Sequence, residues 1–188
     1  MIVMAYGKML SPPDIVKTAL QMLEEEGVQG ISLRAVATAL GVKAPSLYRY
    51  FPQKEVLELA VAYEALEAMS VALQRASAFQ DAEKRFRKTA EAYLRFARDR
   101  FALYSFIMDR VRETHGSAEA KRVWNLLLGA ASAISGQPDD TAAAVATWSF
   151  LHGYAVLEHS GAFGASGPKG ALQLGLTAFL KSFHRNES

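Results

Sequence analysis

The stretch SLRAVATALGVKAPSLYRYFPQKEVL, residues 32–57, decides how the chain begins its fold. It has the length and punctuation of two short helices joined by a tight turn. Ser32 is placed to cap the first helix, and Gly41 stands where the turn needs a positive φ, which glycine adopts without a Cβ clash. Pro52 then separates the second short helix, from about Ala44 to Tyr50, from a long helix that follows.

Apolar residues in this stretch are spaced for packing against each other. Val36 and Ala37 face inward from the first helix, and Leu47 and Phe51 face inward from the second. The pattern predicts a helix-turn-helix over about residues 31–50, a motif that lays its first helix across the DNA backbone and its second in the major groove.

Helix signals recur along the rest of the chain, whereas alternating runs typical of strands do not occur. Ser11, with Pro12 and Pro13 after it, resembles the start of a first helix. We therefore expect an all-α fold of about nine helices. The expected domains are an N-terminal three-helix helix-turn-helix domain over residues 8–55 and a helical bundle over residues 56–188.

The composition of the 188 residues excludes several classes of protein. With no cysteine, the chain has neither disulfides nor thiolate metal sites. It has no signal-peptide pattern and no run near the roughly 18 apolar residues of a membrane span, so we expect a cytoplasmic protein with no membrane segment. His152 and His159 lie about 10.5 Å apart along a helix, too far for one ion to bridge readily, so we expect neither a metal nor a cofactor.

Charge is unevenly distributed, although the formal net charge is only +2. No Asp or Glu occurs between Gly27 and Lys54, where Arg34, Lys43 and Arg49 are present. A segment of one charge sign in a nearly balanced chain indicates a surface that faces an anion. The alternative is an ordinary solvated basic face.

Residues 32–57 resemble the DNA-binding domain of the TetR family of regulators. The resemblance is carried by the Leu-Tyr-x-Tyr-Phe run at Leu47 to Phe51 and by the pair Lys54 and Glu55, which opens the next helix. The position near the N-terminus, ahead of a helical body of more than a hundred residues, is also similar to the family.

The resemblance implies DNA contacts from both motif helices. Arg34 occupies a position that can reach a base edge in the family, and Ser46 and Arg49 project from the recognition helix as the other candidates for base reading. Positions that contact phosphates are occupied by Tyr48, Tyr50 and Lys54.

Two further residues of this region have open roles. Ser32 can cap its helix, bind a phosphate, or do both in turn. Lys43 stands where many family members have a Ser or Thr that caps the recognition helix. Because Lys accepts no hydrogen bond, the cap must come from elsewhere or be absent, and Lys43 is free to approach a phosphate.

Trp148, His152 and Gly153 lie in TWSFLHGYAVLEHSGAF, residues 147–163, which resembles the C-terminal regulatory domain of a TetR subgroup named for a Trp-His-Gly signature. The resemblance implies a bundle enclosing an apolar ligand pocket, with the last two helices forming a homodimer interface. The helix expected over residues 139–159 is apolar on nearly every face and must be covered.

Large side chains of the body are candidates for binding a small-molecule effector. The candidates are Tyr104, Phe106, Met108, Trp124, Trp148 and His152. The alternative is that they form ordinary core, because large residues at helical spacing usually pack against one another.

The resemblance therefore implies a ligand-responsive transcriptional regulator, a repressor in the first instance, with activation as the alternative. Its partners would be a palindromic double-stranded DNA operator, bound as a homodimer, and a largely apolar effector. Competing hypotheses are an enzyme or binding protein for a hydrophobic molecule, and a helical interaction protein with a decayed DNA head. We expect no enzyme, because the sequence has no nucleophile–base motif, no paired catalytic carboxylates and no phosphate loop.

Overall fold

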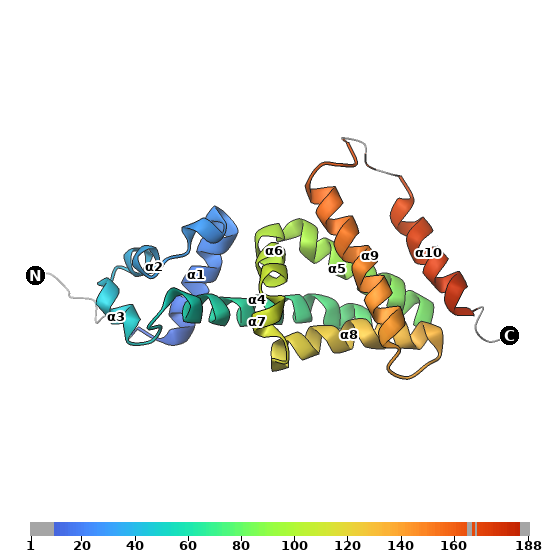
Figure 1. Ribbon diagram of the computed structural model, residues 1–188, viewed down its shortest axis with the longest axis horizontal. Helices are drawn as coiled ribbons and strands as arrows, with labels where there is room; N and C mark the ends of the chain where they lie inside the picture. Colours follow the sequence, from blue (N-terminus) through green and yellow to red (C-terminus); the bar gives the residue numbers. More distant parts are fainter. Residues whose placement is uncertain (1–9, 165–166, 168, 185–188) are drawn as a thin grey trace, which may run out of the picture.

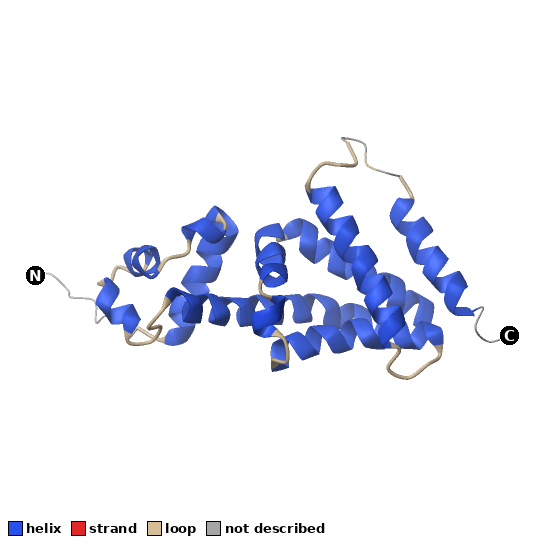
Figure 2. Cartoon of the chain, viewed as in Figure 1, coloured by secondary structure: helices blue, strands red, loops and turns tan. Residues whose placement is uncertain are grey.

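The structure is a computed structural model, and it describes residues 10–164, 167 and 169–184. Every regular element in this part of the chain is a helix, so the all-α prediction is confirmed (Figure 2). The described elements are α1 (Pro12–Glu26), the 3₁₀ turn η1 (Val28–Gly30), α2 (Leu33–Ala39), α3 (Ala44–Tyr48), α4 (Lys54–Ser77), α5 (Ala82–Asp99), α6 (Phe101–Asp109), α7 (Val111–Thr114), α8 (Ala118–Ser135), α9 (Thr141–His159) and α10 (Ala171–His184). None of these helices combines the length and hydropathy needed to cross a bilayer.

The described residues form ten α-helices, one more than expected from the sequence. The extra helix is α7, a single turn of four residues. It is too short to show a helical period, which explains why the sequence did not reveal it.

Helix α4 connects the two ends of an elongated molecule (Figure 1). Helices α1 to α3 lie at one end, α4 runs from them into the body between α5 and α8, and α9 and α10 lie toward the other end. The main cluster of buried apolar side chains extends from Ile15 in α1 to Leu180 in α10. Helices α1 to α3 and the rest of the molecule therefore share a continuous packed core.

The start of α1 follows the pattern expected from its sequence. The Ser11 hydroxyl accepts the Asp14 backbone N–H at 3.4 Å, and prolines occupy the first turn. At the other end of the helix, Gly27 has a positive φ of 74° and its N–H donates to the Leu23 carbonyl at 3.0 Å. These local signals fix both ends of α1.

The contact between α9 and α10 depends on a glycine. A Cβ at Gly175 would lie 2.3 Å from the Phe150 ring of α9, so only glycine lets the two helices approach this closely. The Phe150 ring also packs edge-on against Phe179 of α10, with 5.7 Å between ring centroids. The close approach places α10 over part of the strongly apolar α9.

Candidate nucleic-acid interface and ligand cavity

The turn between α2 and α3 has the geometry that its glycine predicts. Gly41 has a φ of 68°, and its N–H donates to the Thr38 carbonyl at 3.0 Å. The Val42 N–H donates to the Ala37 carbonyl at 2.9 Å. Together these two bonds form a Schellman motif, which satisfies the last carbonyls of α2 and turns the chain sharply into α3.

The two motif helices begin differently. The Ser32 hydroxyl accepts the Ala35 N–H at 3.1 Å, so the predicted cap of α2 is present. At the start of α3 the Lys43 side chain makes no capping hydrogen bond. Pro45 in the first turn of α3 has no N–H, which leaves one donor fewer in need of an acceptor.

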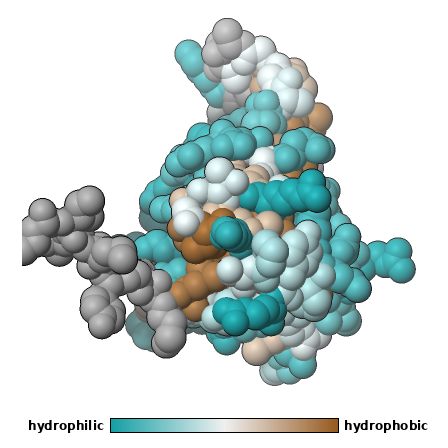
Figure 3. Space-filling model, turned by 90° about the vertical axis from the view of Figure 1, so that its left-hand side faces the viewer, coloured by the Kyte–Doolittle hydropathy of each residue, from teal (hydrophilic) through white to brown (hydrophobic). Residues whose placement is uncertain are grey.

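The residues with expected DNA contacts lie at one end of the molecule, and the space-filling view shows this end as largely hydrophilic around a small apolar area (Figure 3). The exposed members of the set are Arg34, Lys43, Tyr48, Arg49 and Lys54. The half-buried members are Ser32, Ser46 and Tyr50. Leu47 and Phe51 are buried, as their spacing predicts, and they anchor α3 to the core.

Tyr50 also has a structural partner. Its hydroxyl donates to the Leu10 carbonyl at 2.9 Å, which ties the end of the motif to the residues before α1. The Arg49 guanidinium lies 5.8 Å from the centre of the Tyr50 ring. Tyr50 is therefore less free to reach a phosphate than the exposed Tyr48.

Ion pairs join the two ends of helix α6 to helices α1 and α4. Glu58 of α4 pairs with Lys54 at 3.2 Å and with Arg110, just after α6, at 2.7 Å. The Arg110 guanidinium also lies 3.7 Å from the centre of the Phe106 ring. A second pair, between Glu24 of α1 and Arg100 just before α6, spans 2.6 Å. The start of α6 is thus held to α1, and its end is held to α4.

Behind this junction the body contains a cavity of about 490 Å³, a volume typical of small-molecule sites. Helices α4 to α9 all contribute to its wall. Three of the six effector candidates line it, namely Met108, Trp124 and Trp148. The other three, Tyr104, Phe106 and His152, lie outside the lining.

Tyr104 and His152 are connected to the cavity by a chain of hydrogen bonds. The Trp148 indole N–H donates to the Tyr93 hydroxyl at 2.9 Å, and the Tyr93 and Tyr104 hydroxyls are 3.0 Å apart. The Tyr104 hydroxyl lies 2.6 Å from His152 Nδ1. Because the indole can only donate, each tyrosine can accept from one neighbour and donate to the next, ending at the imidazole.

Tyr93 is the residue of this hydrogen-bonded series that the sequence did not indicate as a candidate, since it belongs to the apolar stripe of α5. Burial raises the pKa of Tyr93 well above its usual range, and the nearby Tyr104 raises it further. Burial also raises the pKa of Tyr104. Both side chains therefore remain neutral phenols that can donate hydrogen bonds.

A small void of about 10 Å³ adjoins the cavity, and Trp148 and Leu127 line both. The void is also lined by Thr89 and Thr147, whose buried hydroxyls have no hydrogen-bond partner among the described residues. An unpaired buried hydroxyl is destabilising, so this pair is unusual within the core.

The described residues contain no group of three or more His, Cys, Asp or Glu placed to hold a metal ion. The polar chain from Trp148 to His152 is thus built from aromatic donors and acceptors. Its geometry suits hydrogen bonding beside an apolar cavity.

Comparison with known proteins agrees with this arrangement. Residues 15–61 match the family model for bacterial regulatory proteins of the tetR family, and residues 86–178 match a tetracyclin repressor-like C-terminal domain. An uncharacterized HTH-type transcriptional regulator of Mycobacterium tuberculosis is 31% identical over 159 residues, covering 81% of this chain and 72% of that protein.

Two further comparisons cover the reading end and the whole fold. The class A tetracycline repressor from transposon 1721 of Escherichia coli is 42% identical over 48 residues, which are 26% of this chain and 22% of that repressor. A solved structure of a protein of unknown function from Rhodococcus sp. RHA1 has the same fold, with a TM-score of 0.76, 23% identity, and coverage of 96% of this chain and 97% of that one. The chain therefore belongs to the TetR family of bacterial transcriptional regulators, with a helix-turn-helix DNA-binding domain near its N-terminus.

Proposed function

We propose that this chain is a cytoplasmic, ligand-responsive repressor that binds a palindromic operator as a homodimer and releases it when a small molecule fills the body. The observation that carries the proposal is an apolar cavity partly lined by α6, a helix whose two ends pair with α1 and α4, the helices that support the exposed reading face on α2 and α3. In this scheme residues 8–55 form the reading domain and residues 56–188 form the sensing and dimerising domain. The protein has no catalytic role.

At the operator, Arg34, Ser46 and Arg49 read base edges. Arg34 and Arg49 are the strongest of these readers, because a guanidinium can donate two hydrogen bonds to the O6 and N7 acceptors of guanine. Phosphate contacts come from Tyr48, Lys43 and Lys54, supplemented by Ser32 and Tyr50. The basic charge of the face supports this arrangement, because no acidic residue lies between Gly27 and Lys54 to repel the DNA.

Dimerisation joins α9 and α10 of two copies. Support comes from exposed apolar side chains on these two helices, where Leu174 is 74% exposed and Leu157 is 48% exposed. Such residues gain stability when a second copy covers them. A dimer also places two reading heads about 34 Å apart, the spacing of successive major grooves on one side of B-DNA.

The dimer has two states that differ in the distance between its two reading heads. The effector acts by binding one of these states more tightly than the other. Ile107 and Met108 of α6 line the cavity, and the ends of α6 are paired to Glu24 of α1 and to Glu58 of α4, the helix that runs from the reading domain into the body. A ligand that displaces α6 therefore moves the reading heads. It can shift the equilibrium only by the difference between its affinities for the two states.

The Trp-His-Gly resemblance extends this proposal to the sensing domain. Trp148 and His152 stand at the two ends of the hydrogen-bonded chain, and Trp148 is part of the cavity wall. We place the body in that subgroup on this basis, with Tyr104, His152 and Phe106 supporting the wall instead of touching the effector.

The test is selection of binding sites from a random double-stranded DNA library, followed by affinity measurements with two variants. Arg34→Ala should lose about 5-fold to 150-fold in affinity for the selected site, the range for one good base contact, and keep its dimer. Arg95→Ala removes an exposed arginine of α5 and serves as the matched control.

Three results would refute the proposal: no sequence enriched by the library, equal effects of the two variants, or affinity that does not fall as salt concentration rises. Placing the selected site upstream of a reporter distinguishes repression from activation.

A further inference from the structure

Polar and apolar groups are segregated within the cavity. Its deeper wall is formed mainly by buried apolar side chains, among them Leu66, Met69 and Leu127, and the two buried hydroxyls of the lining, on Tyr93 and Thr114, already make hydrogen bonds within the protein. The lining residues that are solvent-exposed mark its mouth, and the polar ones there are Thr141, His115 and Lys121. A ligand that fits this distribution has a large apolar body and a single polar end.

The charge at the mouth has one sign. The lining includes no Asp or Glu, and Lys121 is its one residue with a permanent charge. Burying an unpaired charge deep in the apolar wall would be costly, whereas a charge at the mouth stays partly hydrated. Lys121 favours an anion there and disfavours a cation.

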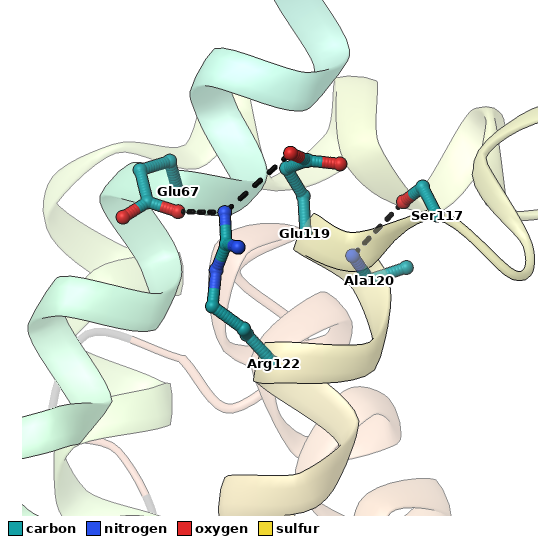
Figure 4. Close-up of polar contacts among 5 residues, drawn as sticks. All are labelled: Glu67, Ser117, Glu119, Ala120 and Arg122. Atoms are coloured by element: carbon teal, nitrogen blue, oxygen red, sulfur yellow. Dashed lines mark hydrogen bonds and ion pairs between the residues drawn. The ribbon is translucent and has the colours of Figure 1, made fainter.

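Two acidic side chains near the start of α8 are engaged by Arg122. Glu67 of α4 accepts from Arg122 at 2.5 Å, and Glu119 lies 3.5 Å from the same guanidinium nitrogen (Figure 4). The first turn of α8 is closed by Ser117, which accepts the Ala120 N–H at 3.0 Å. No ion pair involves Lys121 among the described residues, so its ammonium group is available to a ligand.

We infer that the effector of this cavity is an amphipathic monocarboxylate, with its apolar chain against the deeper wall and its carboxylate beside Lys121 at the mouth. The inference rests on the proposed function in that it takes the cavity as the effector site. It goes further by assigning the charge of the effector and the residue that recognises it. His115 lies at the same mouth and adds a second donor for the carboxylate.

The experiment compares three ligands with the same twelve-carbon alkyl chain and different ends: tridecanoate, dodecanol and dodecyltrimethylammonium, with the two ionic ligands below their critical micelle concentrations and dodecanol below its solubility limit. Binding is read from tryptophan fluorescence, because Trp124 and Trp148 are the two tryptophans of the chain and both line the cavity. The variants are Lys121→Met and, as a matched control, Lys17→Met, which removes an exposed lysine from α1 at the other end of the molecule.

We expect wild-type protein to bind tridecanoate about threefold to fivefold more tightly than dodecanol, the gain typical of a partly exposed ion pair, and to bind the cation most weakly. Lys121→Met should lose this preference for tridecanoate over dodecanol, while Lys17→Met should keep it. Equal binding of all three ligands, absence of binding by all three, or a preference that survives in Lys121→Met would overturn the inference.

The same ligands, added to a complex with the selected DNA site, separate this inference from the proposed function. Tridecanoate that binds with the expected Lys121 dependence and leaves the DNA bound supports the ligand class and contradicts effector-driven release. Release by dodecanol alone supports a sensing role and contradicts the carboxylate assignment.

Discussion

Removal of the Tyr93 hydroxyl tests how much its hydrogen bonds to Trp148 and Tyr104 stabilise the helical body. Replacing Tyr93 with Phe keeps the buried ring and removes only the oxygen, so no cavity forms. The change deletes the bond from Trp148 and the bond to Tyr104, each worth about 1 kcal/mol, and leaves the indole N–H without its acceptor. We expect the free energy of unfolding to fall by about 2–3 kcal/mol, which lowers Tm by roughly 5–10 °C for a chain of this size.

The assay is urea and thermal unfolding followed by circular dichroism, with all variants at one protein concentration because dimerisation contributes to stability. Tyr63→Phe is the matched control, since Tyr63 is half-buried in α4 and its hydroxyl makes no hydrogen bond to another described residue. Its effect should stay within about 0.5 kcal/mol. If Tyr93→Phe unfolds at the same urea concentration as Tyr63→Phe, the hydrogen-bonded chain does not stabilise the protein as argued.

Three further predictions follow from polar groups in and around the body. Thr147→Val removes a buried hydroxyl that has no hydrogen-bond partner in the described part of the chain, so we expect the free energy of unfolding to rise by about 1 kcal/mol in urea titrations; a fall would mean that the hydroxyl is hydrogen-bonded. Because the pKa values of Tyr93 and Tyr104 are raised above 10.0, their contribution to the free energy of unfolding should be constant below about pH 10 and fall above it, since the unfolded chain loses these protons first. The fall should be shallower in Tyr93→Phe. Arg110→Met breaks the pair with Glu58 and should cost about 1–3 kcal/mol in unfolding experiments; DNA affinity without effector should stay within about twofold, and effector-driven release should need more ligand.

The N-terminal motif could be predicted in detail because its signals are local. The Ser32 cap, the positive φ at Gly41 and the burial of Leu47 each depend on residues only a few positions apart. Lys43 was also identified as an unusual start for α3, and its side chain indeed makes no cap. Short-range hydrogen bonding and helical spacing are sufficient for such features.

The cavity could be predicted only in part because it is made by helices far apart in the sequence. Phe106 faces Arg110 beside α4, and Tyr93 becomes a wall residue only when α5 meets α9. Lys121 is one more exposed lysine in the sequence, and its place at the cavity mouth follows from how α8 packs. Residue type indicates that a side chain will be buried, but not which neighbours it will meet.

The continuity of α4 makes the protein sensitive to helical phase. Its 24 residues span about 36 Å without interruption, and its first turn supports the reading end while its later turns lie in the body. One inserted residue would rotate one end against the other by about 100°, whereas seven would restore the original azimuth to within about 20°. Operator binding across a series of insertions in α4 should therefore recover when the inserted length is close to a whole number of turns, at about 7, 11 or 18 residues, and should be lost at lengths between these.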